Sequence, residues 1–193
     1  IKATSDGPAI HKSYKLTILH TNDHHGRFWQ NRHGEYGMAA RKTLVDNIRQ
    51  EVSEAGGHVL LFDAGDINTG IPESDLLDAE PDIRAMNLLQ YDAMVAGNHE
   101  FDNSPEVLEK QEEWMDFPLL SANVFDRESG KRRFPAAAHF QFDGLRVVVL
   151  GLTTGDTYRQ GNPEYVEDYN FKDPIRTASA LVPDLQKEAD VLI

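Results

Sequence analysis

The sequence of 193 residues contains no cysteine. This absence excludes a disulfide framework and any zinc site built on thiolate ligands. A metal site in this chain would therefore have to use histidine, carboxylate or amide side chains. The absence does not identify a cellular compartment.

Basic residues are also scarce, with 19 Lys and Arg against 32 Asp and Glu and a formal net charge of −13. Such a surface repels the phosphate backbone of nucleic acids, so we expect no nucleic-acid polymer among the partners. It equally disfavours docking on anionic membranes. A small phosphate ester can still bind where cations supply local positive charge.

Long hydrophobic runs are missing, and no segment approaches the length of a membrane span. Residues 1–8 are polar and do not resemble a signal peptide, which was either never present or has been removed. We expect residues 1–12 to form a flexible lead-in. The apolar fraction of 40% is enough to give residues 13–193 the core of one domain.

What the chain does contain is an alternation of apolar strand patterns and amphipathic helix patterns. Strands are predicted over residues 14–20, 58–62, 93–96, 117–124, 134–142 and 145–150, with another starting at 191–193. Helices are predicted over residues 38–52, 80–89, 105–114 and 175–189. Asp143 and Gly144 predict a hairpin turn. The order predicts a largely parallel α/β sheet, whose ligands gather at the carboxyl ends of the strands.

The first polar motif follows the strand at residues 14–20. In an extended backbone, residues two apart point the same way, so Asp23 and His25 face one side and His24 the other. A carboxylate and an imidazole on one side can hold one cation together. A solvated polar loop would contain the same residues, and this motif alone does not separate the two interpretations. We expect His24 to be structural or exposed.

The second motif follows the strand at residues 58–62, where Asp66 comes directly after Gly65. A carboxylate has two oxygens and can bridge two cations about 3.5–4 Å apart. Taken alone, Asp66 is better explained as a helix cap or an Asx turn. Asp63 lies nearer the strand and is a weaker candidate for the same role.

The third motif follows the strand at residues 93–96. Asn98 offers a neutral amide oxygen to a second cation, and His99 and Asp102 share one face if a helical turn starts there. A carboxylate that accepts from one imidazole nitrogen fixes the tautomer and raises the pKa of the ring. Such a histidine can stabilise a transferring phosphoryl group or protonate a leaving oxygen. An ordinary turn with a core histidine is the alternative, and Glu100 is assigned no catalytic role.

The order and wording of these motifs resemble the calcineurin-like metallophosphoesterases. More narrowly, they resemble the bacterial periplasmic 5'-nucleotidase and UDP-sugar hydrolase branch. The matching segments are LHTNDHHG at 19–26, GDINTG at 65–70, PESD at 72–75, GNHEFD at 97–102 and GNPEY at 161–165. The resemblance runs from about Tyr14 to the last residue, and it implies a four-layer α/β/β/α sandwich.

The resemblance also implies roles for six residues. His99 and Asp102 resemble the catalytic dyad of the family. The implied metal ligands are Asp23 and His25 for one ion, Asp66 as a bridge and Asn98 for the second ion. The implied reaction is hydrolysis of a phosphate ester by a water that two divalent cations activate for in-line attack on phosphorus. Zinc, manganese or cobalt is the expected metal, a nucleotide or nucleotide sugar the expected substrate, and the periplasm or another exported location the expected compartment.

The family supplies further metal ligands, two His and a third His or Gln, from beyond the position that matches Ile193, together with a nucleoside-binding domain. We therefore expect residues 13–193 to be the N-terminal part of a metallophosphoesterase domain that, in isolation, binds metal weakly and turns over little. Two alternatives stay open. One is a relative acting on cyclic nucleotides or sulfur esters, and the other is a module that binds metal or a partner without catalysis.

Overall fold

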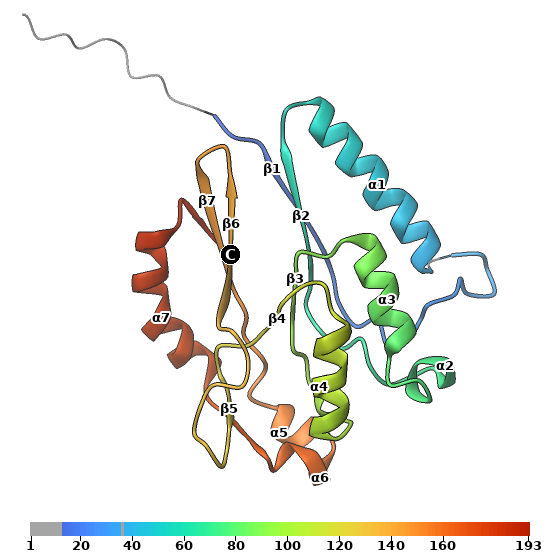
Figure 1. Ribbon diagram of the computed structural model, residues 1–193, viewed down its shortest axis with the longest axis vertical. Helices are drawn as coiled ribbons and strands as arrows, with labels where there is room; N and C mark the ends of the chain where they lie inside the picture. The colour runs from blue at the N-terminus through green and yellow to red at the C-terminus, as the bar shows by residue number, and fades with distance from the viewer. Residues whose placement is uncertain (1–12, 36) are drawn as a thin grey trace, which may run out of the picture.

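The computed structural model describes residues 13–35 and 37–193, so the lead-in predicted for residues 1–12 lies outside the described residues. Four layers follow one another from right to left in Figure 1: helices, a sheet, a second sheet and a helix. This arrangement confirms the predicted α/β/β/α sandwich. Among the described residues, no helix combines the length and apolar character needed to cross a bilayer.

The first sheet contains four parallel strands in sequential order. They are β1 (Leu16–Thr21), β2 (His58–Asp63), β3 (Ala93–Val95) and β4 (Leu119–Leu120). The helices on its outer face are α1 (Met38–Glu54), α3 (Glu80–Leu89) and α4 (Pro105–Trp114). Each of these helices lies between two consecutive strands in the chain, which is the predicted order. The carboxyl ends of β1, β2 and β3 therefore meet at one edge of the sheet.

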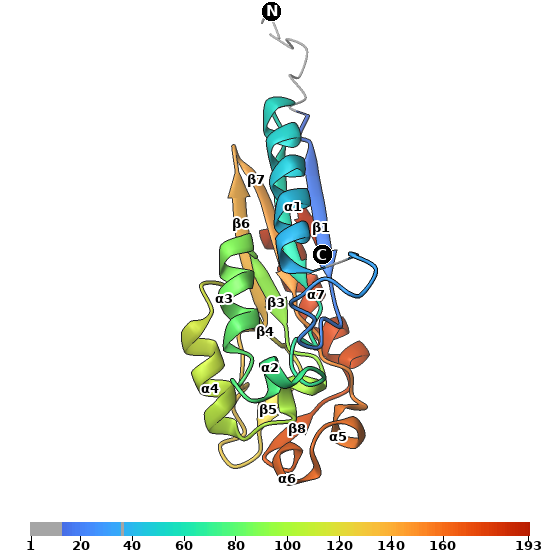
Figure 2. The ribbon, with the colours of Figure 1, turned by 90° about the vertical axis from the view of Figure 1, so that its right-hand side faces the viewer.

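The second sheet pairs β6 (Ala137–Phe142) antiparallel with β7 (Leu145–Leu150), and β7 parallel with β9 (Val191–Leu192). Helix α7 (Pro174–Glu188) covers its outer face (Figure 1). The remaining elements are α2 (Pro72–Asp75), η1 (His99–Phe101), β5 (Val124–Asp126), α5 (Thr157–Gln160), α6 (Pro163–Val166) and β8 (Tyr169–Phe171). Figure 2 shows β5, β8, α5 and α6 gathered at the lower end of the molecule, the end at which β1 also finishes.

Two apolar clusters hold the layers together, one between the helices and the first sheet and one between the two sheets. Strand β2 contributes to both because its side chains alternate: Leu60 and Phe62 face the second sheet and Leu61 faces the helices. A fully buried Leu or Phe side chain contributes about 1.5–3 kcal/mol. The two-sided burial of β2 thus fixes the strand that carries the second motif.

The β6–β7 hairpin turns at Asp143 and Gly144, as predicted. Their φ values of 50° and 98° are typical of the type I′ turn that the Asp-Gly pair favours. Strand β6 begins at Ala137 rather than at residue 134, because Phe134 packs in the cluster beside the helices, on another layer.

The strand predicted over residues 117–124 is wrong as a single element. The chain pairs with the first sheet in β4 and with β8 in β5, and residues 121–123 link the two. The buried side chain of Asn123 explains the break. Its amide donates to the carbonyl oxygens of Thr153 and Lys172 at 2.8 and 2.9 Å, and its oxygen accepts the Thr153 N–H at 2.9 Å. These bonds tie the segment to two loops instead of to a sheet.

Candidate active site

The first two motifs are held together by their own backbones. Beyond the last strand pair, Thr21 and Asp63, the loop after β1 stays bonded to the loop after β2. Three successive bonds of 3.0 Å run from the N–H groups of Asp23, His25 and Gly26 to the carbonyl oxygens of Gly65, Asp66 and Ile67. The protein backbone itself therefore fixes the register of one loop against the other.

Three of the predicted metal ligands have left-handed backbone conformations, with φ of 52° at Asp23, 50° at His25 and 62° at Asp66. Such a conformation costs a non-glycine residue about 1–2 kcal/mol, and strain of this kind collects at functional sites where surrounding bonds hold it. The extended geometry expected for the first motif is therefore wrong. Its consequence is nevertheless observed, since Asp23 Oδ1 lies 3.7 Å from His25 Nε2.

Two glycines allow the third motif to approach the second. A Cβ at Gly97 would lie 2.3 Å from Asp66 Oδ1, and a Cβ at Gly65 would lie 2.4 Å from the backbone nitrogen of Gly97. Gly65 also has a φ of 98°, which side chains disfavour. Any larger residue at either position would push the Asp66 turn away from its neighbour.

Glu100 is a buried residue of the third motif that also bonds to the second motif. It is 1% exposed, and its carboxylate accepts the N–H groups of Gly97 at 2.7 Å and of Asp66 and Ile67 at 2.9 Å. Burial raises the pKa of Glu100 to about 7, against the lowering effect of these bonds. The ionised carboxylate matches the donors, since it presents acceptors alone. Its contacts are structural, in line with the expectation that it takes no catalytic role.

The His25 ring is oriented by backbone carbonyls. Its Nδ1 lies 3.0 Å from the oxygen of Thr69 and 3.3 Å from that of Asn68. Because a carbonyl can only accept, Nδ1 is assigned the proton. Nε2 is then the ring nitrogen left on the side of Asp23, and an imidazole oriented in this way can bind a cation through that nitrogen.

Side chains from all three motifs converge. One ligand atom each from His25, Asp66 and His99 lies within 4.8 Å of the others. The two imidazole rings are 4.9 Å apart and meet edge to face. Asp66 Oδ1 also accepts the backbone N–H of His99 at 2.9 Å. Asp23 joins this cluster through His25, and the half-buried Asn98 directly precedes His99 in the same loop.

His99 and Asp102 form the predicted pair, with Nδ1 of the ring 2.6 Å from Asp102 Oδ2. The hydroxyl of Thr69 donates to the same oxygen at 2.7 Å. Partial burial lowers the pKa of His99, but the hydrogen bond and charge of Asp102 and the charges of two further carboxylates raise it more. The net direction is a pKa above the ordinary histidine value, as the sequence predicted from the spacing.

Two neighbours of the site carry functions that the sequence analysis did not assign. Thr69 orients both histidines, through its carbonyl for His25 and its hydroxyl for Asp102; its place inside the GDINTG segment could have indicated this. Asp63, the weaker candidate, is 3% exposed and accepts the N–H of Gly65 at 2.9 Å and the hydroxyl of Thr21 at 2.5 Å. It supports the loop behind Asp66.

The residues present fit a divalent cation. Imidazole nitrogens and a carboxylate converge, and an amide side chain follows β3 in the same loop as His99. A mixture of imidazole nitrogens and a carboxylate oxygen is typical of sites for divalent metal ions. Nε2 of His25 is the ring nitrogen that the hydrogen bonds at Nδ1 leave available to a metal ion.

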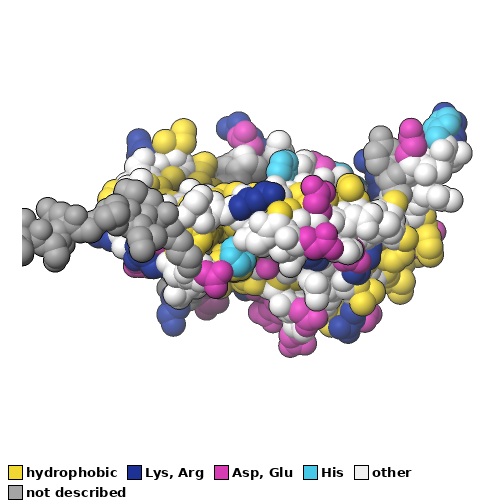
Figure 3. Space-filling model, turned by 90° about the horizontal axis from the view of Figure 1, so that it is seen from above, with side chains coloured by type: hydrophobic (Ala, Val, Ile, Leu, Met, Phe, Trp, Pro, Cys, Tyr) yellow, Lys and Arg dark blue, Asp and Glu magenta, His cyan; other side chains and the backbone are white. Residues whose placement is uncertain are grey.

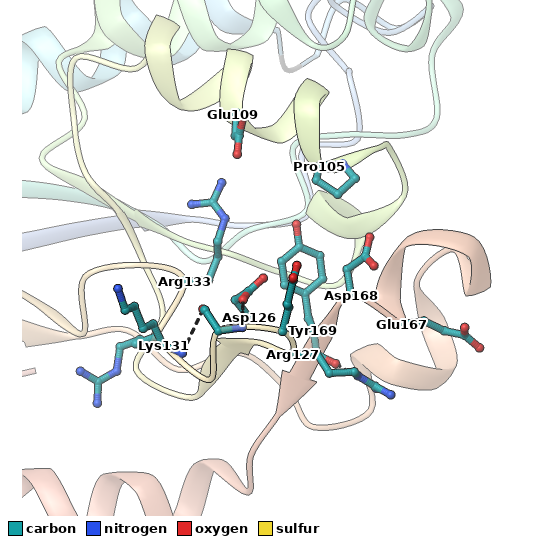
Figure 4. Close-up of a pocket in the computed structure, with 12 residues that line it drawn as sticks. Pro105, Glu109, Asp126, Arg127, Lys131, Arg133, Glu167, Asp168 and Tyr169 are labelled. Atoms are coloured by element: carbon teal, nitrogen blue, oxygen red, sulfur yellow. Dashed lines mark hydrogen bonds between the residues drawn. The ribbon is translucent and has the colours of Figure 1, made fainter.

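The cavities of the molecule differ in how close they come to the predicted site residues. A cavity of about 590 Å³ lies between α4 and the β5–β8 pair, lined by charged side chains of both signs, and contains none of the six predicted site residues (Figure 4). Two hollows, of about 480 and 190 Å³, reach Asp23 and Asp102 respectively. The cluster therefore opens to the surface at the loop edge of the sheet.

Known proteins resemble the chain in sequence and in structure. A 5'-nucleotidase of Vibrio parahaemolyticus is 58% identical over 91% of this chain and 31% of its own length. The protein UshA of Escherichia coli is 56% identical over 94% of this chain and 34% of its own length. The solved NAD nucleotidase of Haemophilus influenzae is 28% identical and superposes with a TM-score of 0.81, over 94% of this chain and 34% of that one.

The chain thus spans about a third of the length of the relatives it matches. A family model described as calcineurin-like phosphoesterase matches residues 16–192, which is nearly the whole of the chain. With the three motif loops meeting at the carboxyl edge of a parallel sheet, the chain belongs to the calcineurin-like phosphoesterase family.

Proposed function

We propose that residues 13–193 are the N-terminal part of a metallophosphoesterase domain that hydrolyses phosphate esters of nucleotides or nucleotide sugars. The observation that carries the proposal is the convergence of His25, Asp66 and His99, whose ligand atoms lie within 4.8 Å of one another. The names 5'-nucleotidase and NAD nucleotidase among its relatives support the substrate class.

Four residues would hold the cations in this proposal: Asp23 and His25 one ion, Asp66 both ions, and Asn98 the second. When bound, two such cations supply an activated water for attack on phosphorus and neutralise the phosphoryl oxygens. The loops already hold the side chains in place, because three backbone bonds and the Glu100 carboxylate fix the strained turns. Zinc, manganese and cobalt suit this donor set.

His99 and Asp102 would act on the phosphoryl group itself. Asp102 accepts the Nδ1 proton, so Nε2 is the atom left to meet the substrate. The raised pKa of His99 favours a second proton on Nε2. That proton can be donated to a phosphoryl oxygen, where it offsets developing charge, or to the leaving oxygen.

The wider protein would supply what these residues do not. Since the chain spans about a third of its relatives, we propose that further metal ligands and a nucleoside-binding domain belong to a longer protein, with a periplasmic or other exported location. The net charge of −13 disfavours a nucleic-acid polymer as substrate. On the end of the molecule drawn in Figure 3, acidic and basic side chains are both scattered, and the basic ones form no continuous patch.

The test measures phosphate release from 5'-AMP by the full-length protein after chelation and after adding back Mn²⁺, Co²⁺ or Zn²⁺. We expect activity that requires the cation and falls about 100-fold or more in Asp66→Asn and in His99→Asn. Asp116→Asn, which changes an exposed carboxylate elsewhere, is the matched control. Activity without cations, or activity unchanged in both site variants, would overturn the proposal. Parallel assays with cyclic nucleotides, UDP-sugars and sulfur esters identify the preferred substrate.

A further inference from the structure

His24 stands between the two proposed ligands of the first cation, yet its side chain points into the protein. It is 3% exposed, and its Nε2 lies 2.9 Å from Oδ1 of Asp82, which is 1% exposed. The two residues are 58 positions apart in the sequence. The loop that carries Asp23 and His25 is thus tied directly to a different element of the fold.

That element is a rigid anchor. Asp82 lies in the first turn of α3, where a carboxylate interacts favourably with the helix dipole. The same helix buries Ile83, Met86 and Leu89 in the main core, each 2% exposed or less. A side chain fixed to the start of α3 therefore cannot shift without moving a helix that the core holds in place.

The motif loop is consequently held from two sides. Its backbone is bonded to residues 65–67 by three hydrogen bonds, and its central side chain is bonded to α3. The residues on both sides of His24 have left-handed φ values of 52° and 50°. Such strained positions persist where their surroundings over-determine them, and the His24–Asp82 bond supplies a second constraint, from a different element than the second motif.

Stability alone does not account for this pair. Among the described residues, His24 Nδ1 and Asp82 Oδ2 are buried without a hydrogen-bond partner. Unpaired buried polar atoms destabilise a fold, and replacing a buried polar pair by apolar side chains is often neutral or stabilising. The pair instead holds a strained loop, and it can thereby fix the geometry of the Asp23 and His25 side chains that the loop carries.

We infer that His24 and Asp82 are positioning residues that set the separation and direction of the Asp23 and His25 side chains for cation binding. This inference rests on the proposed function, because it presumes that those two side chains bind the cation. Neither His24 nor Asp82 touches the cation or the substrate; each acts through the loop backbone. Loss of their bond should therefore change the affinity for the cation and the rate, and leave the affinity for the substrate's organic part largely unchanged.

The test compares three variants of the full-length protein: Asp82→Ala, Asp82→Asn, which retains an acceptor oxygen for His24, and the control Glu112→Ala. The control breaks the contact between Glu112 of α4 and Arg133, neither of which belongs to the motif loops. Mn²⁺ affinity is measured by titration calorimetry on protein from which a chelator has removed the metal. The same samples give kcat, KM for 5'-AMP and the unfolding temperature.

We expect Asp82→Ala to bind Mn²⁺ about 10–100-fold more weakly. Its kcat should be lower, and its KM should change less than about twofold. Asp82→Asn should recover most of the affinity, and Glu112→Ala should bind as wild type does.

A double variant, His24→Leu with Asp82→Leu, keeps the inference testable if Asp82→Ala does not fold. Because an apolar pair fills the same buried space, we expect it to unfold at or above the wild-type temperature and still to bind Mn²⁺ about 10-fold more weakly. Wild-type affinity in a folded Asp82→Ala or in the double variant would overturn the inference and leave the proposed function standing. A wild-type protein that binds no Mn²⁺, Co²⁺ or Zn²⁺ would overturn both.

Discussion

The two sheets of this molecule end in different ways. At the carboxyl edge of the first sheet, the loops contain left-handed Asp23, His25 and Asp66 and a buried carboxylate, Glu100. In the second sheet, β6 and β7 are joined by an ordinary two-residue turn at residues 143–144. Strained backbone costs about 1–3 kcal/mol at each position. The turn of the second sheet also has a left-handed residue, Asp143, but there the type I′ hairpin itself requires that conformation. At the edge of the first sheet no hairpin requires it, so the strained residues there indicate function.

Burial of polar groups divides the molecule in the same way. Strand β7 contributes a run of buried valines, Val147, Val148 and Val149. Most of the buried polar side chains lie in the first sheet or in the loops and helices beside it: His24, Asp63, Asn68, Ser74, Asp82, Glu100 and Gln111. Buried polar groups stabilise a fold only when they are paired. Their concentration near the motif loops indicates that side-chain hydrogen bonds, in addition to apolar packing, hold these loops.

The largest effect is expected from Gly97→Ala, which places a methyl group against the strained Asp66 turn at the edge of the first sheet. The new Cβ would lie 2.3 Å from Asp66 Oδ1 and 2.8 Å from the Asp66 nitrogen, so the Asp66 turn must move. Since a misplacement of about 1 Å can cost about 100-fold in rate, we expect kcat of the full-length protein to fall by at least that factor. Overpacking should also lower the free energy of unfolding by about 1–3 kcal/mol. Phosphate release and urea unfolding measure the two effects.

Gly155→Ala is the matched control. Neither glycine has a left-handed φ, and a Cβ at Gly155 would meet nothing closer than Pro174 Cδ at 3.8 Å. We expect stability within about 0.5 kcal/mol of wild type and an unchanged rate. Equal losses in the two variants would show that the close approach of Gly97 to Asp66 is not the reason for the glycine.

The second effect concerns pH and Asp63, a buried group at the end of β2. Burial raises its pKa from 3.8 to about 6, although bonds from Thr21 and Gly65 lower it. The folded protein therefore holds this proton more tightly than the unfolded chain does, and the free energy of unfolding falls as pH rises from about 4 to about 6. The shift corresponds to about 3 kcal/mol.

Asp63→Asn cannot ionise and should remove that part of the pH dependence. Urea unfolding in a chelating buffer from about pH 4 to about pH 7 gives the difference between variant and wild type. The variant should gain relative stability between about pH 4 and about pH 6, and the difference should level off above the raised pKa. Parallel stability curves for the two proteins would mean that Asp63 does not titrate with a raised pKa in the fold.

The third effect is expected from Glu100→Gln. The side-chain amide would turn an N–H₂ group toward a backbone N–H that the carboxylate now accepts, so one buried donor loses its partner. We expect a loss of about 1–3 kcal/mol in the free energy of unfolding and about a tenfold loss in kcat as the Asp66 turn loosens. The exposed Glu113→Gln should change neither quantity. A Glu100→Gln protein with wild-type stability would show that the carboxylate does not organise the loops.

The layers and the three loops could be predicted from sequence, because their signals are local. The alternation of Leu60, Leu61 and Phe62 defines a strand buried on both faces, and parallel strands bring their carboxyl ends to one edge. The His24–Asp82 bond and the chain break at Asn123 could not be predicted, since their partners lie 58 and 30 residues away. The left-handed residues of the first motif could not be predicted for the same reason, because they accompany hydrogen bonds to residues 65–67, which are distant in the sequence.

The smallest effect is expected from Gly144→Ala, in the ordinary turn of the second sheet. Gly144 has a φ of 98°, a conformation that costs an alanine about 1–2 kcal/mol. Space is not limiting, since the nearest neighbour of the new Cβ is the Tyr14 hydroxyl at 3.4 Å. The turn lies at the opposite end of the molecule from the motif loops (Figure 1). We therefore expect a lower unfolding free energy with unchanged kcat and Mn²⁺ affinity. A loss of activity like that of Gly97→Ala would refute the division between the two sheets, because backbone strain at either end would then affect the reaction alike.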